Sequence, residues 1–333
     1  LIEALMGSFD HSEALAEILP GLFKSYTSGQ GDLAPFFKLA PLNSHRSSNG
    51  TYQVRDTRFG YDAQRGNVGK TSAGGATRGV QAINYSEVAI AMEQFATDWV
   101  YVDDRTKAAL EAGNSDLDAS QEALEYVSDA MGGFLYNELH TAVDSLAAYG
   151  TTLALGTASF DLVGYFQDFS NSIALATGPR FRPNVFGFGP EVYKALLGLD
   201  QVREAARNMG IAYPTKGIAD GEYFRTGKLE VAPALRNVLA QAGIEPVLID
   251  ESYKDSTGTQ AWQFGSTKGF SGHAAAGRRP SCLKIFSPYD ELIEVVTGTL
   301  APPYKPGEAY MVEAEYQIKT VDSNLGNEIT ITT

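Results

Sequence analysis

The clearest pattern in the sequence is a run of apolar residues, spaced three and four apart, that extends over residues 116–149. This spacing is typical of a continuous apolar stripe along an α-helix. Ser115 can cap the start of the helix, with Asp118 in the capping-box position, and Gly150 can end it in a left-handed conformation. At 1.5 Å per residue such a helix would be roughly 50 Å long, about three times the usual length. A strut that reaches neighbouring subunits is one interpretation, and an ordinary core helix of a large enzyme is the other.

Residues 46–84 are predicted to form a long β-hairpin. Tyr52 and Val54 alternate with polar residues at 51–56, a glycine-rich stretch follows, and a second extended run leads back through 80–83. The segment has no apolar face from which to build a core, and an isolated two-stranded hairpin is only marginally stable in water. We therefore expect the hairpin to lie on another surface.

The segments on either side of this hairpin have their own patterns. Residues 1–45 are interrupted by prolines and glycines, which predicts an extended arm with one short helix at 12–23 or, alternatively, a poorly ordered terminus. After the hairpin, apolar residues alternate with polar ones at 88–92, and 99–102 is a further predicted strand.

Between residues 160 and 250, helical and strand patterns alternate, which predicts a compact α/β domain. Pro190 occupies the favoured first position of a helix, and Gly210 and Gly243 follow the ends of two others. Helices are expected at 160–176, 190–197, 200–209 and 233–242, and strands at 184–188 and 246–250. A loop rich in Gly, Ala and Ser is predicted at 265–279. Strands follow at 283–286, 292–296, 310–319 and 328–332.

The composition of the 333-residue chain is that of a folded protein, with 44% hydrophobic and 20% charged residues. Its net charge of −14 disfavours non-specific attraction to nucleic acid or to an anionic membrane. The longest uncharged run, Ser145–Phe160, is shorter than the roughly 20 apolar residues that span a bilayer. A cytosolic protein is therefore expected.

No constellation in the sequence points to a catalytic, cofactor or metal site. Residues 66–71 end in Gly-Lys-Thr, but a phosphate-binding loop needs a glycine where Gln64 or Arg65 stands. Cys282 is the single cysteine, which excludes an intramolecular disulfide and favours a small core residue. The histidines do not show the three- or four-residue spacing of metal ligands on a helix; they are His11, His45, His140 and His273.

The charge distribution is more informative than any motif. Residues 46–80 contain six basic and two acidic residues, a balance of +4, whereas 81–150 contain two basic and thirteen acidic residues, a balance of −11. Such complementary charges can steer and register one surface on another. The hairpin could fold onto its own acidic helix, but its predicted reach of roughly 50 Å favours a neighbouring subunit. The residues expected at this contact are Arg55, Arg58, Arg65 and Lys70 on the hairpin and Glu122, Glu125 and Asp129 on the helix.

The order of these parts resembles the major capsid proteins of tailed bacteriophages, the Hong Kong phage type of fold, which encapsulins share. The resemblance rests on the extended loop at 46–84, on WVYVDDR at 99–105 leading into the long helix, and on PNVFGF at 183–188 followed by VYKAL at 192–196. Glu138 lies where the family often has a glutamate, two-thirds along the helix, and joins the expected inter-subunit residues. The match covers nearly the whole chain, in pattern more than in identity.

The resemblance implies an α+β fold in four parts. These are an N-terminal arm at 1–45, an extended β-hairpin loop at 46–84, a peripheral domain at 85–155 and 300–333 with its spine helix at 116–149, and a compact axial α/β domain at 156–299.

It also implies a structural protein without catalysis or cofactors, which assembles as pentamers and hexamers into an icosahedral shell. The shell would enclose double-stranded DNA without sequence-specific contacts, form in the host cytoplasm without a membrane, and include portal and scaffolding or decoration proteins. The start at Leu1 would fit removal of a scaffolding segment, or an end not included in this sequence. Some relatives cross-link their subunits through a lysine of the extended loop, and Lys70 is the candidate here. The alternative is that Lys70 is an ordinary surface lysine that contacts the acidic helix of the neighbouring subunit.

Two other functions stay open on the sequence. An encapsulin, a protein compartment that holds enzymes, is the alternative within the same fold. An α/β enzyme with a dimerising hairpin is the alternative from another class.

Overall fold

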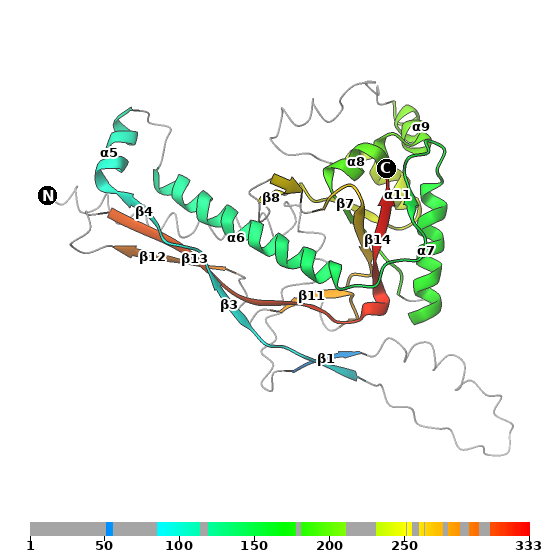
Figure 1. The fold of residues 1–333 in the computed structure, drawn as a ribbon, viewed down its shortest axis with the longest axis horizontal. Helices are drawn as coiled ribbons and strands as arrows, with labels where there is room; N and C mark the ends of the chain where they lie inside the picture. Colours follow the sequence, from blue (N-terminus) through cyan, green and yellow to red (C-terminus); the bar gives the residue numbers. More distant parts are fainter. Residues whose placement is uncertain are drawn as a thin grey trace, which may run out of the picture.

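The computed structural model describes residues 51–55, 85–113, 119–177, 181–210, 231–250, 252–254, 260–262, 264–275, 279–286, 293–299 and 307–333. The arm predicted at 1–45 and most of the hairpin predicted at 46–84 lie outside these residues, so those predictions stay untested. The described parts form an elongated frame of one long helix on a sheet, joined to a compact α/β part (Figure 1).

The long helix is α6, Ala119–Asp144, whose 26 residues correspond to about 39 Å. Its predicted apolar stripe is confirmed by burial. The buried side chains are Leu124, Val127, Met131, Leu135, Leu139 and Val143. Phe134, which the pattern also assigned to this stripe, is instead 38% exposed.

The predicted end of this helix at Tyr149, with Gly150 as its cap, is wrong. The helix ends at Asp144 because the following chain pairs with the last strand: Tyr149 donates its N–H to the Glu328 carbonyl at 2.8 Å, and Ala148 bridges to the same residue. Tertiary pairing therefore overrides the helical pattern here. A separate helix, α5 at Asp104–Gly113, precedes α6 and was not predicted.

The sheet beneath α6 is organised around β13, Gly307–Thr320. One edge of β13 pairs with β11 (Leu283–Phe286) and β12 (Ile293–Thr299), and the other with β3 (Glu93–Ala96) and β4 (Val100–Asp103), all antiparallel. Alternate residues of β13 are buried, and α6 runs along that face (Figure 1). The buried side chains on this face are Tyr310, Val312, Ala314 and Tyr316.

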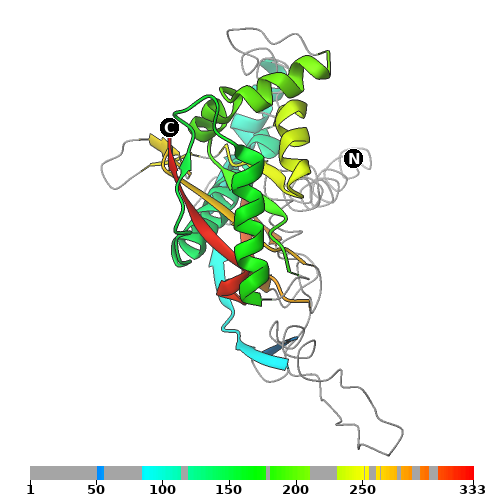
Figure 2. The same ribbon diagram turned by 90° about the vertical axis from the view of Figure 1, so that its right-hand side faces the viewer.

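The compact part contains a second sheet with the strand order β5-β14-β10-β6-β7. Its strands are β5 (Leu153–Ala154), β6 (Val185–Phe188), β7 (Glu245–Leu248), β10 (Lys268–Gly272) and β14 (Gly326–Thr332). The surrounding helices are α7 (Leu162–Thr177), α8 (Pro190–Leu197), α9 (Asp200–Asn208) and α11 (Pro233–Gln241). Figure 2 shows α7 running beside β14. A short hairpin of β8 (Ser252–Lys254) and β9 (Gln260–Trp262) and a 3-10 turn at Ser323–Leu325 complete the described elements.

Local signals predicted the helices of this part well. Gly210 and Gly243 both have positive φ, 69° and 75°, which is the conformation expected of glycines that end helices. Pro190 lies at the first turn of α8, as predicted. The loop predicted at 265–279 is wrong in part, because β10 is a central strand of the sheet. Its Gly269 is needed because a Cβ there would lie 2.9 Å from the Phe186 ring and 3.0 Å from the Gly187 carbonyl oxygen.

The strand pairings cut across the predicted domain bounds. β11 and β12, predicted in the axial domain, pair with β13. β14, predicted in the peripheral domain, pairs with β10 and β5 in the compact sheet. These pairings show which strands share a sheet, and the domain bounds themselves stay a prediction.

The base of the predicted hairpin is present. β1 (Thr51–Arg55) pairs antiparallel with β2 (Tyr85–Ala89), from Thr51 opposite Ala89 to Arg55 opposite Tyr85. The return strand therefore extends beyond the predicted limit of residue 84. In both views this pair lies at the opposite end of the molecule from α8, α9 and α11 (Figures 1 and 2).

We expect Gly269→Ala to lower the free energy of unfolding by about 1–3 kcal/mol, because the new methyl group overpacks the contact between β10 and β6. The matched control is Gly265→Ala, where a Cβ meets no atom within 4 Å. Urea unfolding of the subunit measures both. Equal stabilities of the two variants would contradict the central position of β10.

Candidate assembly surface

The structure places only some of the predicted contact residues. Glu122 is exposed on the first turns of α6, and Glu138 is half-buried farther along the same helix. Arg55 ends β1 at the hairpin base. Arg58, Arg65 and Lys70 lie outside the described residues, and Glu125 and Asp129 are described only as backbone positions of α6.

A groove runs between the β3–β4 segment and the outer face of α6. Its volume is about 460 Å³, and its walls are residues 94–98 and, from the helix, Tyr126, Val127, Ala130, Met131 and Phe134. Tyr126 is 67% exposed, and Phe134, at 38%, faces the same space. The long helix therefore presents aromatic side chains to solvent beside its acidic ones. The exposure of Tyr126 could not be predicted from the sequence, because a single aromatic residue outside the apolar stripe is common on helices.

Three aromatic rings in contact lead from the core to this groove. The Tyr316 ring lies 4.8 Å from the Phe95 ring, which lies 4.9 Å from the Phe134 ring. The Tyr316 hydroxyl is buried and has no hydrogen-bond partner among the described residues. Burial raises the pKa of this hydroxyl, and the carboxylates of Glu138 and Glu93 raise it further. Glu138 follows Phe134 by four residues on α6, so the two lie on the same face of the helix.

The groove has an acidic surround. Asp98 lines it and is exposed, Glu93 is exposed at the start of β3, and Glu122 is one turn before Tyr126. An apolar floor with acidic residues around it suits an incoming segment that carries both aromatic and basic side chains.

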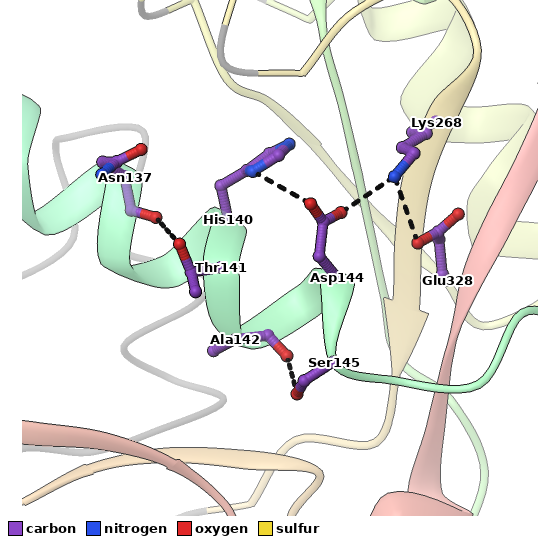
Figure 3. A network of polar contacts seen from close by, with 8 residues as sticks. All are labelled: Asn137, His140, Thr141, Ala142, Asp144, Ser145, Lys268 and Glu328. Carbon is purple, nitrogen blue, oxygen red and sulfur yellow. Dashed lines mark hydrogen bonds and ion pairs between the residues drawn. The ribbon is translucent and has the colours of Figure 1, made fainter.

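A polar network joins the end of α6 to the compact sheet (Figure 3). Lys268 on β10 donates to Asp144 at 3.1 Å and lies 3.6 Å from the Glu328 carboxylate on β14. The hydrogen bond to Asp144 raises the pKa of Lys268. An acidic residue at a helix C-terminus opposes the helix dipole, so this lysine offsets an unfavourable charge. His140 Nδ1 lies 3.5 Å from Asp144, and its ring packs edge-on against Phe264.

This network contributes little energy. Its effect is to hold the end of α6 in position against the compact sheet. Lys268 and Asp144 are 44% and 39% exposed, so solvent screens their attraction, and such a pair contributes about 0–1 kcal/mol. The backbone adds to it, because Glu328 both accepts from Tyr149 and donates to Ala147. The angle between α6 and the compact sheet is therefore set by several contacts of different kinds.

The buried ionisable groups have the environments of core residues. Burial raises the pKa of the Cys282 thiol, which keeps it protonated and a poor nucleophile, so the prediction of a small core residue is confirmed. Burial lowers the pKa of Lys284 to about 8, and its ammonium donates to the Arg279 carbonyl at 2.8 Å. Within the described part of the chain, no group of three or more His, Cys, Asp and Glu residues is arranged to hold a metal ion. None of the helices described there is long and apolar enough to cross a membrane.

Comparison with known proteins gives different results for the sequence and for the structure. No family model and no curated protein matches the sequence. A phage-related protein from Bordetella bronchiseptica matches the structure with a TM-score of 0.57, at 14% identity, over 94% of this chain and 96% of that one. The chain has the fold of a tailed-phage capsid protein.

Lower-scoring matches include shells of two kinds. The capsid of cyanophage P-SCSP1u gives a TM-score of 0.48 at 15% identity, over 90% of this chain and 88% of that one. The SrpI encapsulin complex of Synechococcus elongatus gives 0.46 at 11% identity, over 85% and 82%.

The described elements correspond to the parts that the resemblance predicted. α6 is the long helix that the resemblance predicted, β13 is the strand beneath it, and the sheet of β5, β14, β10, β6 and β7 forms the compact part. The fold class predicted from the sequence is therefore confirmed. The predicted contact residues stay a prediction, since one subunit does not show what covers the groove.

Proposed function

We propose that this chain is a major capsid protein, the structural subunit of an icosahedral shell that encloses double-stranded DNA. Subunits assemble as pentamers and hexamers in the host cytoplasm and form the virion capsid, together with portal and scaffolding or decoration proteins. The protein carries no catalytic activity of its own, and it contacts the packaged DNA without reading its sequence.

The observation that carries this proposal is the capsid fold over nearly the whole chain, matched end to end by a phage-related protein. Two features of the molecule support it. The hairpin base lies at the far end from α8, α9 and α11 in both views, so the hairpin starts where a neighbour can be reached (Figures 1 and 2). The net charge of −14 also suits the wall of a container for nucleic acid, because it keeps the packaged polymer from adhering.

Electron microscopy and sedimentation of the purified chain test the proposal. The expected result is closed shells of megadalton mass. Shells that form inside cells and contain long double-stranded DNA support a capsid, whereas shells filled with a cargo protein identify the encapsulin alternative. A stable species of one or two subunits under all assembly conditions would contradict a shell and favour the enzyme with a dimerising hairpin.

We further propose that the hairpin of one subunit lies over the groove and acidic face of the adjacent α6. Arg55, Arg58, Arg65 and Lys70 would meet a surface formed by Glu122, Glu125, Asp129 and Glu138. The exposed Glu122, the exposed Asp98 in the groove wall and the position of Glu138 one helical turn after Phe134 support this pairing. The exposed Tyr126 and Phe134 add an apolar contact that the charge pattern alone did not suggest.

Reversing Arg55, Arg58 and Arg65 to glutamate should block assembly and leave the circular dichroism of the subunit unchanged. Exposed ion pairs contribute only about 0–1 kcal/mol each, but an assembled shell repeats them in every subunit. Reversing Glu122, Glu125 and Asp129 to lysine should partly restore assembly, because both signs are then exchanged. The yield of shells in sedimentation measures each step.

The control is the triple Arg→Lys variant at the same three positions, which keeps the charge and should assemble. Raising the salt concentration should weaken wild-type assembly, since the Debye length falls from about 10 Å at 0.1 M to about 3 Å at 1 M. Normal assembly of the triple glutamate variant would show that backbone pairing and apolar packing hold the hairpin, and that the charges do not.

A further inference from the structure

The root of the hairpin is held to the subunit in an unusual way. The ladder between β3 and β13 ends where Glu93 faces Tyr316. For the residues that precede Glu93, hydrogen bonds from two side chains of β13 replace the backbone pairing. Gln317 accepts the Ala91 N–H through Oε1 at 3.0 Å, and Lys319 donates its ammonium to the Ala89 carbonyl at 2.6 Å.

An apolar cluster accompanies these two hydrogen bonds. Phe286 on β11 is 1% exposed and packs against four partly buried side chains, which are Val88, Ile90, Met92 and Val321. The intervening Glu87, Ala89 and Ala91 are exposed. The segment 88–92, which links β2 to β3, therefore turns one face to the subunit and the other to solvent. We call Phe286 and these four residues the root cluster.

The register shows which face of the sheet this root occupies. Phe286 lies directly opposite Gln317 in the ladder, so both side chains point to the same side. Side chains alternate along a strand, so Gln317 and Lys319 face away from the side where Val312, Ala314 and Tyr316 meet α6. The hairpin root thus covers the face of the β11–β13 sheet that α6 leaves open.

The two kinds of contact have different consequences. Apolar burial in the root cluster is non-directional and allows the strand to slide or rotate on Phe286. Hydrogen bonds to Ala89 and Ala91 require one position and one direction of the strand. Ala89 is also the residue opposite Thr51, where the β1–β2 ladder begins, so holding its carbonyl holds the base of the whole hairpin.

We propose that Gln317 and Lys319 are positioning residues, which set the direction in which the hairpin leaves the subunit and so decide whether subunits can assemble. This inference rests on the proposed shell function. It assigns to two side chains of β13 a role that neither the charge pattern nor the groove requires.

The test compares two double variants. Gln317→Leu with Lys319→Met removes both hydrogen bonds and keeps the side chains similar in size. Gln317→Glu with Lys319→Arg keeps an acceptor for the Ala91 N–H and a donor for the Ala89 carbonyl. We expect the first variant to form shells with a yield at least roughly tenfold lower than wild type, and the second to stay near the wild-type yield. Circular dichroism and the thermal midpoint of the separate subunit should be nearly the same for all three.

Amide hydrogen exchange of residues 85–92 in the separate subunit gives a readout that does not depend on assembly. These amides should exchange faster in the Leu/Met variant and at the wild-type rate in the Glu/Arg variant. Lys319→Met alone replaces the double variant if the latter fails to fold.

Shells of normal yield and diameter from the Leu/Met variant would overturn the inference, as would equal losses in both variants. If wild-type protein forms no shells, the proposed function fails. The exchange rates then decide separately whether these side chains hold the root: unchanged rates in the Leu/Met variant would overturn that as well.

Discussion

The packing of α6 on β13 is the interaction on which the rest of the structure depends. The apolar stripe of the helix and the alternating buried side chains of the strand bury each other along most of their lengths. β13 also pairs with four other strands, so this contact holds the long sheet together as well. Because apolar burial is the main favourable term in folding, a helix and strand of this length give the subunit a stiff axis. The compact part and the base of the hairpin are both attached near the end of that axis where α6 and β13 finish.

Two kinds of contact hold the parts that are attached at this end. At the end of α6, Lys268, Asp144 and Glu328 join the helix to the compact sheet, and backbone pairing of residues 147–149 with β14 reinforces them. Near the end of β13, Gln317, Lys319 and the root cluster seat the hairpin on the sheet face that α6 does not cover. The groove beside Tyr126 and Phe134 lies nearer the start of α6 than these contacts do. The proposed shell function would use this arrangement, in which one rigid body holds the base of a hairpin and also carries an exposed groove.

Much of this could be predicted from local signals, and the misses have physical causes. The helices bounded by Pro190, Gly210 and Gly243 were predicted closely, because caps and breakers act within a few residues. β10 was missed because Gly269 reflects contact with Phe186, which is distant in sequence. The end of α6 was predicted too late in the chain, because residues 147–149 pair with β14 and do not continue the helix. The groove, Gln317 and Lys319 could not be predicted, since their roles come from which strands become neighbours. Charge balance and the order of parts predict an assembling protein, and this stays a prediction.

A cryo-electron microscopy map of the assembled shell tests the central claim most directly, because the chain can be followed from Ala89 and Thr51 outward to the hairpin tip. The account predicts that the hairpin crosses to the adjacent subunit and lies over the groove between its β3–β4 segment and α6, with basic side chains near Glu122 and Glu138. A hairpin that folds back onto α6 of its own subunit, with the neighbour's groove open to solvent, would contradict it.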